Sequence, residues 1–287
     1  MKKLLIPIDF SENSTKALAY AAEIANESGH ELDLIHIFKG HDHIYANALS
    51  GDELVDPQIG LAKRELTKLT KVLHEKYPSL ITNFFFSDGN LFEEISRQTA
   101  STKYDAIIMG TKGSSGLESI FIGSNTYNVL LNTRTPVLAL PISVEHVKKD
   151  KVGLLCNFKD AEIDVLKQAL PLFGIDYELV LIHINADDSP IQDIDDKFKN
   201  WIDRIAKETG IDNISYVIKP KSYYIHQSDT ISNSIVNVII DEGIEVILIT
   251  KSKKSIFRKM LDENIVKNMA YQINIPKFFA KVLPVTK

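Results

Sequence analysis

A segment rich in glycine and hydroxyl-bearing residues, from Gly110 to Thr126, has the composition of a phosphate-binding loop. It reads GTKGSSGLESIFIGSNT. Glycine lets backbone N–H groups approach a ligand closely, and successive N–H groups can form a concave site for anions. The hydroxyl groups of Ser124 and Thr126 add further donors. Because the segment contains neither GxxxxGK[ST] nor GxGxxG, it predicts a phosphate site that works without a lysine clamp.

Single glycines in this segment also have ordinary structural interpretations. Gly110 could simply turn a strand into the loop, and Gly116 could cap the following helix. The spacing of the whole set favours the phosphate site over these separate roles.

The segments around this loop alternate between short apolar runs and helical patterns, and these elements determine where the loop lies. Five apolar runs predict strands: Lys3–Asp9, Leu32–Phe38, Ile81–Phe86, Asp105–Gly110 and Pro136–Leu140. Apolar residues at helical spacing predict helices between them: Asn13–Ser28, Ala62–Leu73, Leu91–Ile95 and Leu117–Leu131. Such strands suit a parallel sheet buried on both faces, and the alternation predicts a doubly wound α/β domain. Ligands of such sheets bind at the carboxyl ends of the strands, near the point where strand order reverses.

The second half repeats this order of elements. Its predicted strands are Lys151–Cys156, Tyr177–Ile184, Asn213–Lys219, Glu245–Thr250 and Phe278–Leu283. Its predicted helices have apolar faces within Ala161–Ala169, Ile194–Ile205, Ile231–Val238 and Phe257–Met269. Two copies of one plan indicate a duplicated domain. We therefore expect two doubly wound, Rossmann-like domains in tandem, each with a five-stranded parallel sheet, over residues 1–143 and 150–287, joined near Ser143–Lys149.

The spacing Gly110-x2-Gly113-x9-Gly123-Ser124 resembles the G-x2-G-x9-G-[S/T] motif of ATP-binding universal stress proteins. Leu5–Ser11 (LIPIDFS) is similar to the first strand and turn of that family, and Thr135–Leu138 (TPVL) to its last strand. The resemblance covers the layout of both halves, but its motifs are strong only in the first.

The resemblance implies roles for individual residues. Asp9 would hydrogen-bond the nucleoside, with Pro7 beside it, and the backbone of Ile37 would contact adenine. Gly110 would approach the ribose. The remaining residues of the motif would surround the phosphates: Gly113, Gly123, Ser124 and Asn125. Mg²⁺ could accompany these phosphates, although no protein-only metal site and no catalytic residue is predicted. An alternative role for Asp9 is capping the next helix.

The second half departs from the motif at each informative position. Thr250 and Lys253 replace the first two glycines, and Glu263 and Asn264 replace Gly123 and Ser124. Asn157 stands where the first half has Asp9. Glu263 would bring a negative charge to the phosphate position, which is unfavourable in a partly buried site. We therefore expect no ATP in this half.

A basic run follows the fourth predicted strand of the second half: Lys251, Lys253, Lys254, Arg258 and Lys259. Such a run is usually a solvated face, with an anion or partner site as the alternative.

Histidine and cysteine side chains offer weaker candidates. His36 and His183 lie at matching positions inside predicted strands, where hydrogen-bonded core histidines explain them better than catalysis. Cys156 ends an apolar strand, so a buried, inert thiol is expected. His41, Asp42 and His43 lie together in a predicted loop, but their spacing matches no standard metal site.

Charge and cysteine content restrict the class of protein. The net charge of −5 does not favour nucleic-acid binding. The apolar run after Met1 is too short for a signal peptide, and no stretch approaches the roughly 20 apolar residues of a membrane span. One cysteine in 287 residues fits a reducing compartment. We therefore expect a cytoplasmic protein.

The resemblance implies an ATP-binding stress-response or signalling module with an unknown protein partner. Two alternatives remain open: a slow ATPase or phosphotransfer enzyme, although the motif offers no general base or arginine finger, and a nucleotide-independent interaction protein. In the family the last strand is an exposed edge. We expect the edges Val137–Leu140 and Phe279–Leu283 to pair within one chain, because free edges invite aggregation. Whether two chains form a homodimer is left open.

Overall fold

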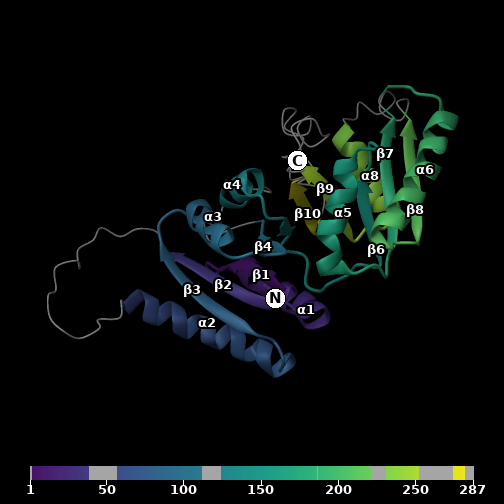
Figure 1. The fold of residues 1–287 in the computed structure, drawn as a ribbon. Helices are drawn as coiled ribbons and strands as arrows, with labels where there is room; N and C mark the ends of the chain where they lie inside the picture. Colours follow the sequence, from purple (N-terminus) through teal and green to yellow (C-terminus); the bar gives the residue numbers. More distant parts are fainter. Residues whose placement is uncertain are drawn as a thin grey trace.

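The computed structural model describes residues 2–38, 57–111, 124–185, 187–220, 231–251 and 274–281. In this part of the chain, strands and helices alternate as expected (Figure 1). The strands of the first half are β1 (Lys3–Pro7), β2 (Glu31–Phe38), β3 (Thr82–Asp88), β4 (Ala106–Gly110) and β5 (Val137–Leu140). The helices between them are α1 (Glu12–Ser28), α2 (Pro57–Lys76), α3 (Leu91–Ser101) and α4 (Ser124–Asn132).

The second half follows the same order. Its strands are β6 (Lys151–Leu155), β7 (Glu178–Asn185), β8 (Ile214–Pro220), β9 (Val246–Lys251) and β10 (Lys277–Lys281). Its described helices are α5 (Asp160–Phe173), α6 (Ile191–Thr209) and α8 (Ile231–Asp241). The predicted helix within Phe257–Met269 and the loop containing His41, Asp42 and His43 lie outside the described residues.

The two halves share one ten-stranded sheet. The strand order is β3-β2-β1-β4-β5-β10-β9-β6-β7-β8, and the strands within each half are parallel. The edges β5 and β10 pair antiparallel, with Phe278 opposite Leu138 and Phe279 opposite Val137. These four side chains are buried. The expected pairing of the two edges within one chain is therefore confirmed.

Apolar side chains fill both faces of the sheet. One continuous core extends under α1 and α5, and it contains residues of both halves such as Leu18, Tyr20, Leu166 and Phe173. The opposite face has one core for each half. Strands buried on both faces explain why their sequences are apolar at nearly every position.

The turn into α1 differs slightly from the sequence prediction. β1 ends at Pro7 rather than Asp9, because the chain then bends through Phe10 with a φ of 62°. Ser11 caps the helix, and its side chain accepts a hydrogen bond from the Ser14 N–H group. Gly29 ends the helix in a left-handed conformation (φ 73°), which glycine adopts without steric cost.

None of the helices in the described part of the chain combines the length and the apolar character that a bilayer span requires.

Candidate nucleotide-binding site

The predicted nucleoside residues lie at the carboxyl ends of adjacent strands. β1 lies between β2 and β4, and strand order reverses at this point. Asp9 follows β1, Ile37 is near the end of β2, and Gly110 ends β4. Pro7 is buried in β1, opposite Ile35 of β2, and Ile37 is half-buried. The fold thus brings Pro7, Asp9, Ile37 and Gly110 to one edge of the sheet.

Asp9 organises the turn that leads into α1. Its Oδ1 atom accepts hydrogen bonds from the Ser11 N–H group at 3.1 Å and the Ser11 hydroxyl at 2.6 Å. Its own N–H group donates to the Ser14 hydroxyl at 3.4 Å. Asp9 therefore holds Ser11, the residue that caps α1. This role is similar to the helix capping by Asp9 that the sequence offered as an alternative. Its side chain is nevertheless exposed, so a ligand can reach it.

Glycine is required at position 110 because a side chain there would have no room. A Cβ atom at this position would come within 2.5 Å of Cγ and Nδ2 of Asn13, which is buried at the start of α1. The Gly110 carbonyl accepts a hydrogen bond from the Thr126 hydroxyl at 2.9 Å, and this bond fixes the first turn of α4 beside the end of β4. The sequence analysis did not identify Asn13, whose only signal was its place just after the Asp-Phe-Ser turn.

The phosphate-binding part of the motif is described only at its end. Ser124 begins α4, and Asn125 is exposed in its first turn. Backbone N–H groups at the start of a helix favour anions. Gly113 and Gly123 lie outside the described residues, so their roles stay predictions.

The turn after the first strand is duplicated in the second half. Phe10 and Phe158 both have positive φ angles, 62° and 59°. Nδ1 of His36 donates to the Ile8 carbonyl at 2.7 Å, and Nδ1 of His183 donates to the Cys156 carbonyl at 2.9 Å. Each histidine ring lies against the phenylalanine of its own half, with ring centroids 4.7 and 5.2 Å apart. Both histidines therefore have the predicted hydrogen-bond partner, but they are half-buried rather than core residues.

Comparison with known proteins agrees with this geometry. The model of the universal stress protein family matches residues 1–141. The chain is 31% identical to universal stress protein MJ0531 of Methanocaldococcus jannaschii over 139 residues, which is 48% of this chain and 81% of that protein. The chain belongs to the universal stress protein family.

Further relatives agree with this assignment. Universal stress protein YxiE of Bacillus subtilis is 27% identical over 144 residues, 47% of this chain and 96% of the relative. A universal stress protein from Archaeoglobus fulgidus superposes along 97% of this chain and 96% of its own, with a TM-score of 0.66 at 20% identity. That match supports the fold of both halves together.

The second half of this universal stress protein has different side chains around the equivalent turn. Ala161 stands at the position of Asn13, and Thr250, almost fully buried, at that of Gly110. Glu162 replaces Ser14, and its Oε1 atom accepts a hydrogen bond from the Asn157 N–H group at 2.8 Å. Burial raises the pKa of Glu162 to about 7. In the turn after β6, the Glu162 carboxyl group therefore takes the place of the Ser14 hydroxyl of the first half.

Two other expectations can be compared with this structure. Cys156 is buried and burial raises the pKa of its thiol, as expected of an inert cysteine. Lys251 is not part of a solvated face: it is only 6% exposed, and its ammonium group binds backbone carbonyls of the first half. That prediction was wrong for Lys251, because β9 extends one residue further than expected and carries Lys251 into the joint between the halves. The rest of the basic run lies outside the described residues.

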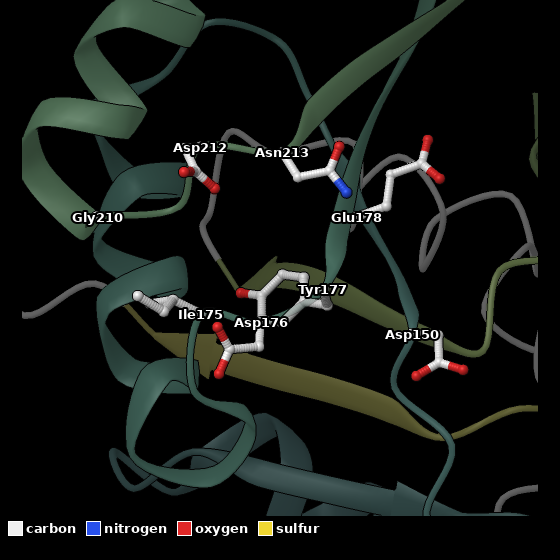
Figure 2. A pocket seen from close by; sticks show the side chains of 8 residues that line it. All are labelled: Asp150, Ile175, Asp176, Tyr177, Glu178, Gly210, Asp212 and Asn213. Atoms are coloured by element: carbon white, nitrogen blue, oxygen red, sulfur yellow. The ribbon is translucent and has the colours of Figure 1, made fainter.

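A pocket of about 440 Å³ is lined by residues of the second half (Figure 2). Asp150, Tyr177 and Asn213, which line it, immediately precede β6, β7 and β8, so the pocket lies at the amino ends of these strands. The pocket is therefore not the predicted nucleotide site, which belongs to the carboxyl ends of strands in the other half.

Within the described ranges, no group of three or more acidic, histidine or cysteine side chains is arranged to hold a metal ion.

Proposed function

We propose that this universal stress protein binds ATP in its first half and acts as a stress-response or signalling module. The main support is the convergence of Asp9, Ile37 and Gly110 with the start of α4 at the point where strand order reverses. The motif that begins at Gly110 continues to the first residues of this helix. The single, buried cysteine fits a reducing compartment, and the proposal therefore includes a cytoplasmic location.

The residues present fit a nucleoside triphosphate. Gly110 adds no side chain of its own at the end of β4, and the buried amide group of Asn13 lies against it. The exposed Asp9 carboxylate would accept hydrogen bonds from ribose hydroxyls or from the adenine amine. The first N–H groups of α4 would face the phosphates, where the helix dipole favours negative charge. Mg²⁺, when bound, would be held mainly by the phosphates and water.

The second half fits such a ligand poorly. The Glu162 carboxyl group already accepts a hydrogen bond from the N–H group of Asn157 in the turn after β6. The buried Thr250 adds a side chain at the position equivalent to Gly110. The proposal therefore assigns one ATP to each chain.

Calorimetric titration of Mg-ATP into nucleotide-free protein tests this function. The expected result is one site per chain, lost in Gly123→Asp because the new carboxylate repels the phosphates. Gly60→Asp, the same substitution on α2 where the added side chain has open space, should bind as the parent does. cAMP, which one universal stress protein binds in its crystal structure, is titrated as a second test compound.

The other outcomes separate the alternatives. Two sites per chain would show that the second half also binds nucleotide. No binding would favour an interaction protein without a nucleotide. Sustained release of phosphate, absent in Gly123→Asp, would favour the slow ATPase.

A further inference from the structure

Lys251 connects the second half to a helix of the first. It is the last residue of β9, and its ammonium group donates hydrogen bonds to the Leu130 carbonyl at 3.0 Å and the Thr133 carbonyl at 3.4 Å. Leu130 is in the last turn of α4 and Thr133 directly follows the helix, where helix carbonyls have no partner within the helix. A cationic donor at this end also interacts favourably with the helix dipole.

The same end of α4 is packed into the second half. Leu130 is fully buried in a hydrophobic core that consists mainly of second-half residues, among them Ile247 and Phe279. Val129, the preceding residue, belongs to the core of the first half. α4 therefore spans the joint between the halves.

The opposite end of α4 belongs to the predicted phosphate site. Thr126 ties the first turn to the Gly110 carbonyl, and Ser124 and Asn125 complete the motif. The helix has nine residues, about 13 Å at 1.5 Å per residue. A hydrogen-bonded helix of this length moves as a unit, so a change at one end displaces the N–H groups at the other.

We propose that Lys251 is a positioning residue for the nucleotide site, supplied by the half that has lost its own site. It holds the C-terminal end of α4 so that the N-terminal N–H groups of the helix face the phosphates. The inference rests on the proposed binding of ATP. By linkage, nucleotide binding must stabilise this contact between the halves as much as the contact favours the nucleotide.

Burial agrees with a fixed role for this side chain. Desolvation lowers the pKa of Lys251 to about 7, yet the neutral amine also donates hydrogen bonds. Either form of the side chain therefore has N–H donors for the two carbonyls at the end of α4.

The test compares Lys251→Met with Lys277→Met. Lys277 is a second buried lysine at the joint, in β10, and its ammonium group donates to the Ile275 carbonyl of its own half at 3.3 Å. Two measurements are made: the dissociation constant of Mg-ATP, and the hydrogen exchange of α4 amides without nucleotide. We expect Lys251→Met to weaken ATP binding about three- to tenfold, as for lost hydrogen bonds to the helix end, and to accelerate exchange in α4. Lys277→Met should change neither as much, and Lys251→Arg should recover part of both.

The outcomes distinguish this inference from the proposed function. Unchanged ATP affinity and unchanged exchange in Lys251→Met would overturn the positioning role. Equal loss of affinity in Lys277→Met would also overturn it, because general destabilisation would then explain the effect. If the parent protein binds no ATP, the proposed function fails, while exchange in α4 still decides whether Lys251 holds the helix. If Lys251→Met does not fold, Lys251→Gln provides the same two measurements.

Discussion

The side chain of Asn13 lies directly against Gly110. A Cβ atom added to Gly110 would be 2.5 Å from Cγ and 2.8 Å from Oδ1 of Asn13, closer than such atoms pack in proteins. The first turn of α1 and the last residue of β4 are thus fitted to each other. In the second half this pair is exchanged: Thr250 has the larger side chain and Ala161 the smaller one. The larger and the smaller residue are therefore exchanged between the equivalent positions of the two halves.

We expect Gly110→Thr to lower the free energy of unfolding by about 1–3 kcal/mol, since the new side chain overpacks a buried contact. Adding Asn13→Ala should recover most of this loss, because the pair then matches Ala161 and Thr250. Neither variant should bind ATP. Urea denaturation and ATP titration measure the two effects separately. A Gly110→Thr protein as stable as the parent would contradict the packing argument.

The Glu162 carboxyl group predicts a pH dependence of stability. Its pKa of about 7 in the folded protein lies above the ordinary 4.5 because of burial, so the folded state favours the protonated form. The stabilisation that protonated Glu162 gives the folded state is complete below about pH 4.5 and is lost as the pH rises to 7. In Glu162→Gln, the free energy of unfolding should decline less between pH 4.5 and pH 7 than in the parent, by up to about 3 kcal/mol. Denaturation at pH 5 and pH 7.5 measures it, and equal declines in both proteins would refute the prediction.

Lys277 predicts the opposite change at higher pH. Burial lowers its pKa from 10.5 to about 7 in the folded protein, so the folded state favours the neutral amine. Between about pH 7 and 10.5 the unfolded chain binds the additional proton, and stability rises with pH. The free energy of unfolding of the parent should therefore rise relative to that of Lys277→Met as the pH rises from 7 to 9. The effect is at most about 1.4 kcal/mol for each pH unit. A stability difference that does not change with pH would exclude this mechanism.

The pairing of β5 with β10 predicts that separated halves associate. Residues 1–143 and 144–287, expressed apart and mixed, should form a one-to-one complex, because Leu138 and Phe278 are fully buried at this edge. Phe278→Lys should abolish the complex by placing a charge there. Light scattering after size-exclusion chromatography measures both masses. Two soluble, monomeric halves would mean that the linker alone keeps the edges together.

The sequence by itself determined the order of elements, the duplication and the position of the candidate site. Apolar runs such as Leu32–Phe38 and Glu245–Thr250 are readable because a strand buried on both faces has no polar face to confuse the pattern. The matching Ile-His-Ile steps around His36 and His183 showed that the plan occurs twice. The site followed because a parallel sheet places Asp9 and Gly110 at one edge once the strands are known.

Only the tertiary structure decided which side chains meet across these elements. Asn13 and Gly110 are 97 positions apart, and their contact depends on how closely α1 approaches β4. Lys251 was misjudged because a lysine in a basic run is normally solvated; it is buried here because two edge strands join the halves and bring α4 over the end of β9. Local patterns report which face of an element is apolar, whereas partners across the fold are set by packing between elements distant in the chain.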